Sequence, residues 1–196
     1  MNRTLRIAVA DDEPRMLQFY KEILHLLGHE VICAAGNGAD LIDRCRSERP
    51  DLVITDIKMP DMDGIDASQQ IAAQDPVPII LVTAHDDPEL LGRAGAGHVL
   101  AYLVKPIKRQ DLQPAIIIAM RRFEEFQALQ KEASDLRQAL QDRKLIERAK
   151  GILMKRTGRD EPSAFKTMQH LAREKNRKLV QIAEMILTAE EAFGNE

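Results

Sequence analysis

The first hundred residues alternate short apolar runs with longer amphipathic stretches. The apolar runs predict buried strands over 6–10, 31–34, 52–56, 79–83 and 101–104. Between them, apolar positions recur every three or four residues, which predicts helices over about 16–27, 39–47, 65–74 and 88–96. Strands that alternate with helices are typical of a parallel sheet covered on both faces, so we predict an α/β fold.

The helical pattern that begins near Asp111 has no obvious end. No proline or glycine interrupts the chain from Ala115 to Lys150. The first apolar positions of this helix form one face that suits packing on the sheet: Leu112, Ala115, Ile116, Ala119, Met120 and Phe123. The next ones follow a heptad: Phe126, Leu129, Ala133, Leu136 and Leu140. Such a helix usually pairs with another. Self-association is the simplest interpretation, with a lone extended helix or an intrachain hairpin as alternatives.

The remaining residues predict short helices that the long helix joins. The long helix should end at Gly158, and Pro162 suits the first turn of a second helix. Asn176 is a plausible cap before a last helix that starts near Leu179. We therefore expect a small three-helix module at the C-terminal end.

Charge is distributed unevenly along the chain, whose net charge is −3. Residues 143–178 carry 12 Lys and Arg against 4 Asp and Glu, whereas residues 1–142 carry 16 against 23. A basic block in an acidic protein suits either an anionic partner such as nucleic acid or a solvated helical surface.

The composition argues against membrane and thiolate–metal classes. No apolar run approaches the roughly 20 residues that span a bilayer, and the first residues lack a signal-peptide pattern. Cys33 and Cys45 have no metal-ligand spacing and are predicted to be reduced structural thiols. We expect a cytoplasmic protein with no membrane partner.

Polar groups capable of chemistry follow several of the predicted strands. Asp11 and Asp12 follow the first strand, Asp56 ends the third, Thr83 ends the fourth and Lys105 follows the fifth. The carboxyl ends of parallel strands share one sheet edge, so these groups can converge. Clustered carboxylates need a cation, and Mg²⁺ is the natural one. The Asp56 carboxylate can then act as a nucleophile toward a phosphoryl group, with Lys105 and Thr83 binding the transferred phosphate.

These motifs resemble the receiver domain of two-component response regulators. They are Val9-Ala10-Asp11-Asp12-Glu13, Asp56-Ile57-Lys58-Met59-Pro60-Asp61-Met62-Asp63-Gly64, Val82-Thr83-Ala84 and Tyr102-Leu103-Val104-Lys105-Pro106. The resemblance implies a five-stranded, doubly wound, flavodoxin-like fold and phosphorylation of Asp56 by a histidine kinase. His98 stands where such receivers usually have glycine.

The resemblance also assigns roles at the sheet edge. It implies Mg²⁺ held by Asp12, Asp56 and the backbone carbonyl of Lys58, with Asp11 acting through water. It implies that Thr83 moves toward the phosphate while Tyr102 changes rotamer. Lys58 and His85 would line the route of hydrolytic water, or would be exposed side chains with no kinetic role. The protein is then a phosphoacceptor and not an enzyme with an external substrate.

Two features of the basic block, residues 143–178, bear on what it contacts. Arg143, Glu147, Lys150 and Met154 share one side of the helix. Gly151 weakens the helix unless another helix or a ligand backbone approaches closely there.

Residues 125–193 resemble the ANTAR domain, an RNA-binding three-helix output module. The residues that carry the resemblance are Leu136, Leu140, Arg143, Ile146, Ala149, Lys150-Gly151-Ile152-Leu153-Met154, Ala164-Phe165, Asn176, Leu179 and Ala183. It implies a transcription antiterminator whose dimer binds paired RNA stem-loops. The predicted RNA contacts are Arg143, Arg148, Lys150, Gly151, Lys155 and Arg173. Gln169 occupies a position that is often Arg in this family.

We therefore predict a receiver domain over 1–123, a coiled-coil linker helix over 124–142 and an ANTAR output module over 143–196. The predicted function is phosphorylation-controlled RNA binding and transcription antitermination by a homodimer. The alternatives are a DNA-binding transcriptional regulator and a coiled-coil signalling adaptor that binds no nucleic acid.

Overall fold

A parallel five-stranded sheet organises the N-terminal part of the chain. The computed structural model describes residues 3–84 and 99–193. The strands are β1 (Arg6–Ala10), β2 (Glu30–Ala35), β3 (Leu52–Asp56), β4 (Ile79–Thr83) and β5 (Val99–Val104). All neighbouring strands pair in parallel in the order β2-β1-β3-β4-β5. The predicted α/β doubly wound fold is confirmed, and β5 begins two residues earlier than its apolar run indicated.

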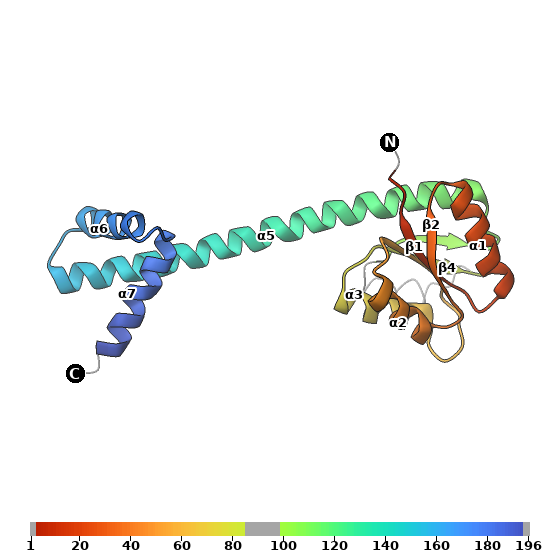
Figure 1. Ribbon diagram of the computed structural model, residues 1–196, viewed down its shortest axis with the longest axis horizontal. Coiled ribbons are helices and arrows are strands. Elements are labelled where there is room, and N and C mark those ends of the chain that lie inside the picture. Colours follow the sequence, from red (N-terminus) through yellow and green to blue (C-terminus); the bar gives the residue numbers. More distant parts are fainter. Residues whose placement is uncertain (1–2, 85–98, 194–196) are drawn as a thin grey trace. The chain divides into compact units, whose positions relative to one another are not determined.

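Helices cover both faces of this sheet (Figure 1). They are α1 (Pro14–Leu26), α2 (Gly38–Glu48), α3 (Gly64–Gln74) and the start of α5 (Arg109–Thr157). Helices α2 and α3 pack on one face around Ala8, Val53 and Leu81, whereas α1 and α5 pack on the other around Val9, Ile54 and Val82. Because both faces are covered, the central strands β3 and β4 are buried throughout and their sequences are apolar without alternation.

Local sequence sets the ends of these helices. Asn37 and Asp63 accept hydrogen bonds from backbone N–H groups three residues on, which caps α2 and α3. Gly28, at φ +84°, follows α1 in a conformation that glycine adopts without strain. The helix predicted over 88–96, together with His85 and His98, lies outside the described residues.

Helix α5 is continuous over 49 residues. Its first turns bury the predicted apolar face, with Leu112, Ile116 and Ala119 almost fully buried against the sheet. Pro114 lies in the second turn, where its missing N–H removes the intrahelical hydrogen bond that the carbonyl of Gln110 would otherwise accept. The helix then continues past Phe123 with its side chains exposed from Glu124 to Gln141.

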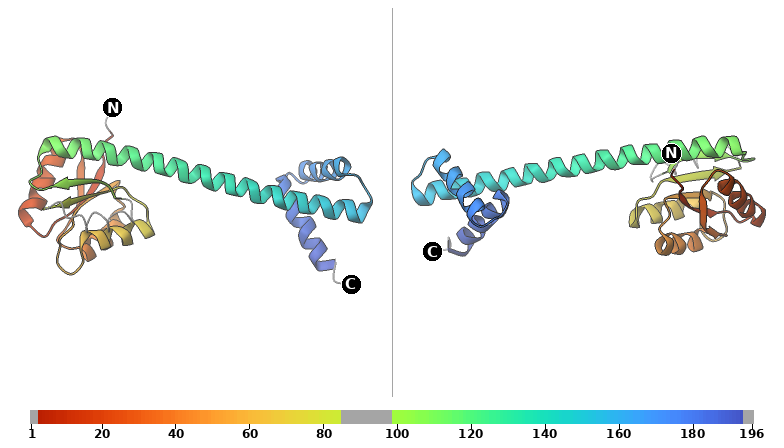
Figure 2. Two further views of the ribbon diagram at one scale, coloured as in Figure 1. Left: turned by 180° about the vertical axis from the view of Figure 1, so that it is seen from behind. Right: turned by 45° about the horizontal axis from the view of Figure 1, so that its top comes forward.

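The C-terminal end of α5 forms a three-helix module with α6 (Glu161–Glu174) and α7 (Leu179–Phe193). Its core gathers around Ala149, Met168 and Ala183, which are fully buried. Asp160 caps α6, and Asn176, at φ 48°, turns the chain into α7. Figure 2 shows α6 and α7 against the same end of α5 from two further directions.

Contacts divide the chain into two units, residues 1–127 and 128–196. Helix α5 contributes to both. The predicted boundaries after residues 123 and 142 stay predictions, since both fall inside this unbroken helix.

Candidate functional site

Three carboxylates meet at the carboxyl edge of the sheet. Asp11 follows β1 and is fully buried, Asp56 ends β3 and is 6% exposed, and Asp12 is exposed. One oxygen from each lies within 4.8 Å of the others. An all-oxygen set of this size matches the ligand preference of a hard divalent cation. The residues therefore fit the predicted magnesium site.

Lys105 is ion-paired with both buried acids. Its Nζ lies 2.6 Å from Asp56 Oδ2 and 2.9 Å from Asp11 Oδ2. Burial lowers the pKa of Lys105, but its pairing with the two carboxylates outweighs burial and raises the pKa. Burial raises the pKa of Asp11 despite this pairing. Ionised Asp11 is therefore held at a free-energy cost that a bound cation would reduce.

The loop after β3 holds the Asp56 carboxylate in place. The N–H of Lys58 donates to Asp56 Oδ1 at 3.3 Å, and the N–H of Gly64 donates to the carbonyl of Ile57 at 2.8 Å. A Cβ at Gly64 would overlap the backbone carbonyl of Asp56. The position therefore requires glycine, and the loop places the backbone of Lys58 beside the carboxylate, where a metal-binding carbonyl is predicted.

Thr83 and Tyr102 lie on the neighbouring strands. Thr83 is buried at the end of β4, and its carbonyl accepts a 2.8 Å hydrogen bond from the N–H of Lys105. Tyr102 and Val104 are exposed on β5, and Val104 pairs in register with Thr83. The geometry brings Thr83 close to the acidic edge and leaves the Tyr102 ring accessible, whereas their predicted movement is a proposal.

Tyr20 was not among the predicted site residues. Its side chain is fully buried on α1, and its hydroxyl has no hydrogen-bond partner among the described residues. Burial raises its pKa, and the charges of Asp11, Asp56 and Glu13 raise it further. The apolar spacing of α1 includes Tyr20 as a core position, so the sequence held no separate signal for its hydroxyl.

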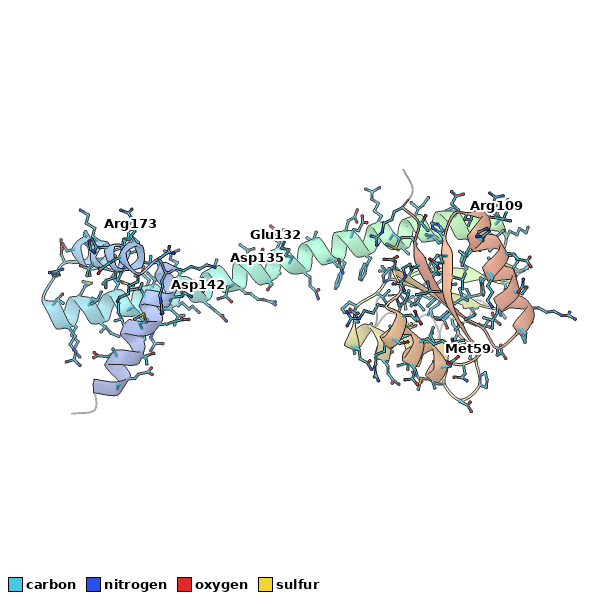
Figure 3. All side chains as sticks on the ribbon, in the orientation of Figure 1. Met59, Arg109, Glu132, Asp135, Asp142 and Arg173 are labelled. Atoms are coloured by element: carbon cyan, nitrogen blue, oxygen red, sulfur yellow. The ribbon has the colours of Figure 1, made fainter. Side chains whose placement is uncertain are left out.

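The heptad face of α5 is exposed. Phe126, Leu129, Leu136 and Leu140 are exposed, and Leu129 retains 66% of its accessible surface. Glu132, Asp135 and Asp142 project from the same stretch of helix (Figure 3). All positions from 124 to 141 are exposed in the described chain, so the alternative of an intrachain hairpin along this stretch is wrong.

Lys150 is tied into the module itself. Its Nζ lies 2.6 Å from Glu147 on α5 and 2.6 Å from Glu161 at the start of α6, and these hydrogen bonds raise its pKa. The residue is 8% exposed. Lys150 thus connects α5 to α6, and its predicted contact with RNA remains untested.

A different stripe of α5 is open and basic. Lys144, Arg148, Gly151 and Lys155 follow one another at i, i+4, i+7 and i+11, and all are exposed. A Cβ at Gly151 would meet nothing within 4 Å. The expected close approach of another helix at Gly151 is therefore wrong among the described residues. Lys144, which directly follows Arg143 in the chain, was not among the predicted RNA contacts.

The other predicted RNA contacts are also exposed. Arg143 lies on α5. Arg173 lies in the last turn of α6 (Figure 3). Gln169 is exposed on α6 as well.

Comparison with known families matches both parts of the chain. Residues 7–117 match the response regulator receiver domain, and residues 134–187 match the ANTAR domain. The chain belongs to the response regulators that join a receiver domain to an ANTAR domain. The resemblance inferred from the strand-end acids and from the Lys150–Met154 block is thereby confirmed.

Individual relatives agree with this assignment. The transcriptional regulatory protein PdtaR of Mycobacterium tuberculosis is 41% identical over 182 residues, which are 93% of this response regulator and 89% of PdtaR. A receiver domain structure from Clostridium thermocellum is 32% identical, with a TM-score of 0.55 over 62% of this chain and 98% of that one. A receiver of a modulated diguanylate cyclase from Desulfovibrio desulfuricans gives a TM-score of 0.59 at 25% identity, over 62% of this chain and 98% of that one.

Two further findings concern membrane-spanning helices and the cysteines. No helix within residues 3–84 and 99–193 combines the length and apolar character needed to cross a membrane. Cys33 and Cys45 are buried free thiols, and burial raises the pKa of Cys45 to about 12.

Proposed function

We propose that this response regulator receives a phosphoryl group on Asp56 from a histidine kinase and thereby controls RNA binding by its ANTAR module. The observation that carries the proposal is the arrangement of Asp56 with Asp11, Asp12 and Lys105 at one sheet edge. It provides a nucleophile, an oxygen-ligand set for a cation and a mobile counter-charge. The output is transcription antitermination.

Phosphoryl transfer follows from the geometry of the acids. An Asp56 oxygen attacks phosphorus, and the bond from phosphorus to the kinase's histidine nitrogen breaks, which leaves an acyl phosphate on Asp56. Magnesium, held by Asp12, Asp56 and the Lys58 carbonyl, with Asp11 acting through water, would offset the charge of the phosphoryl oxygens. Lys105, which pairs with the free carboxylate, moves to pair with the phosphate, and Thr83 donates to it.

The heptad face of α5 supports a homodimer. Phe126, Leu129, Leu136 and Leu140 present an exposed apolar seam at coiled-coil spacing. A second copy supplies an identical seam. The dimer is cytoplasmic and brings two ANTAR modules to one RNA, as recognition of paired stem-loops requires.

Flanking charges favour a parallel dimer. With Phe126, Ala133 and Leu140 at heptad position a, Glu132 takes position g and Arg137 takes position e. In a parallel dimer Glu132 of one protomer faces Arg137 of the other. An antiparallel arrangement instead brings glutamates near glutamates on the g side and Arg137 near Lys144 on the e side, which is repulsive.

RNA binding is assigned to the exposed cationic groups. Arg143, Arg148, Lys155 and Arg173 are available, and Lys144 extends the open stripe around Gly151. Glycine there lets a ligand backbone approach the helix, and hairpin loops expose the phosphates and bases that such side chains bind. Lys150 supports this surface by joining α5 to α6.

The experiment treats the full-length protein with a small acyl phosphate and magnesium, and compares it with Asp56→Asn. Incorporation of acid-labile phosphate into the wild type and none into the variant supports Asp56 as acceptor. Equal incorporation contradicts it. Hairpin RNA and duplex DNA are then titrated into both proteins at low salt. Preference for hairpin RNA supports the output, preference for duplex DNA supports the DNA-binding alternative, and binding to neither supports the adaptor.

A further inference from the structure

Two buried polar atoms beside the acidic edge lack ordinary hydrogen bonds. The Tyr20 hydroxyl has no partner among the described residues, although the side chain is fully buried. Asp11 Oδ2 attracts Lys105 Nζ across 2.9 Å but accepts no hydrogen bond of good geometry from the described residues. Buried polar groups are nearly always satisfied, so this pair needs an explanation.

The Tyr20 hydroxyl and the Asp11 carboxylate are complementary as hydrogen-bond donor and acceptor. Tyr20 supplies an O–H donor and Asp11 a carboxylate acceptor. Helix α1 starts three residues after Asp11, and the Tyr20 ring lies in the core formed with Val9 on β1 and Ile54 on β3. Asp11 and Asp56 stand two residues beyond Val9 and Ile54, so strand alternation places both acids on the same side of the sheet as Tyr20. The charges of both acids act on the Tyr20 hydroxyl.

We propose that Tyr20 is a positioning residue of the magnesium site. Its hydroxyl donates a hydrogen bond, through one ordered water, to the Asp11 carboxylate and so fixes the water through which Asp11 acts on the cation. A buried water that supplies hydrogen bonds to buried polar groups which otherwise lack them is a normal part of protein cores. Groups that orient a metal's ligands in this way commonly contribute 10- to 100-fold to metal affinity. This inference rests on the magnesium site proposed above.

The test is calorimetric titration of Mg²⁺ into the unphosphorylated full-length protein. Tyr20→Phe removes only the hydroxyl, and we expect it to weaken Mg²⁺ binding by about tenfold. Leu24→Val is the matched control, because Leu24 is fully buried one turn further along α1 in the same core but carries no polar atom. It should lower thermal stability and leave Mg²⁺ affinity unchanged.

Thermal melting without magnesium gives a second readout. If the hydroxyl is bridged by water, Tyr20→Phe leaves the melting temperature unchanged or lowers it. If the hydroxyl is truly unpaired, its removal relieves a buried polar group and raises the melting temperature, which overturns the proposal.

The titration separates two failures. If the wild type binds no Mg²⁺, or binds it as well after Asp56→Asn and Asp12→Asn, the magnesium site itself is wrong and the role of Tyr20 falls with it. If the wild type binds Mg²⁺ and Tyr20→Phe binds it equally well, or Leu24→Val weakens binding as much, the role of Tyr20 alone is overturned.

Discussion

Lys105 Nζ lies 2.6 Å from Asp56 Oδ2, so the predicted phosphoacceptor is ion-paired within its own protein. The same ammonium reaches Asp11 at 2.9 Å. The side chain of Lys105 is 16% exposed and the carboxylate of Asp11 is completely buried. In the unphosphorylated protein, Lys105 thus offsets carboxylate charge that a bound divalent cation is also proposed to offset. After phosphorylation, the phosphate is proposed to become the partner of Lys105.

Removal of this counter-charge should destabilise the receiver unit. We expect Lys105→Met to lower the free energy of unfolding by about 3 kcal/mol in a chelator, because two buried carboxylates lose their partner. Added Mg²⁺ should restore much of this loss. Urea unfolding with and without Mg²⁺ measures both effects. Lys108→Ala is the control, since Lys108 is exposed and forms no side-chain ion pair within the described residues. If Lys105→Met lost as much unfolding free energy with Mg²⁺ as in the chelator, the cation would not share the role of Lys105 in offsetting the carboxylate charges.

The buried charge of Asp11 should appear in the pH dependence of stability. Burial raises its pKa above the ordinary value of 3.8, so the folded protein binds this proton more tightly than the unfolded chain does. The resulting stability is complete below pH 3.8 and is lost as the pH rises through the folded-state pKa.

Asp11→Asn removes that loss. In a chelator, we expect its melting temperature, relative to wild type, to increase from acid to neutral pH, and its stabilisation by Mg²⁺ to be smaller. Thermal scans across this range measure both. A difference from wild type that does not vary with pH would show that burial of the Asp11 charge does not govern stability.

The sequence predicted the fold and the acidic edge because both depend on local patterns. Apolar runs such as 52–56 locate strands, and a parallel sheet brings their carboxyl ends together wherever the helices pack. The pairing of Lys150 with Glu161 is different, because it depends on how α6 returns against α5. The Tyr20 hydroxyl is different too, because a core position at helical spacing does not reveal where its polar atom points.

The long helix α5 likewise has features that the sequence predicted and one that depends on packing. Its heptad positions and its continuity were predicted from the sequence; the described structure confirms the continuity and leaves the heptad positions exposed. The exposed basic stripe of Lys144, Arg148 and Lys155 was missed, because helical spacing yields several candidate faces. Only the packing of α6 and α7 decides which face stays open.

Charge reversal should test the dimer and its direction. In a parallel dimer, Glu132→Arg places Arg against Arg137 of the other copy and should weaken self-association by about tenfold, as a repulsive pair replaces an attractive one. Glu132→Arg combined with Arg137→Glu should restore it. Sedimentation of each protein measures the dissociation constant.

A seam variant provides the control for that experiment. Leu136→Lys should abolish the dimer without unfolding the monomer, because Leu136 is 65% exposed. If the double charge reversal fails to restore association, or if Leu136→Lys remains dimeric, the parallel coiled coil is wrong.

Substitution of Lys150 should change the stability of the module, whereas substitution of Arg148 should change RNA binding. Lys150→Met breaks the link between α5 and α6, so it should lower the melting temperature of the module. Arg148→Ala should leave the melting temperature unchanged, weaken binding to hairpin RNA and lower the salt slope by about one unit. Melting curves and RNA titrations at several salt concentrations measure both. Unchanged stability in Lys150→Met together with a lower salt slope would mean that Lys150 contacts RNA directly.

The central claim is that phosphorylation of Asp56 controls RNA binding through the dimer. Its most direct test is the affinity of full-length protein for a paired stem-loop RNA, measured with and without a small acyl phosphate in the presence of Mg²⁺. We expect the phosphodonor to tighten binding by the wild type at least tenfold, because two modules then bind one RNA, and to have no effect on Asp56→Asn. Equal affinity of phosphorylated and unphosphorylated wild type, with phosphate incorporation verified, would contradict the claim.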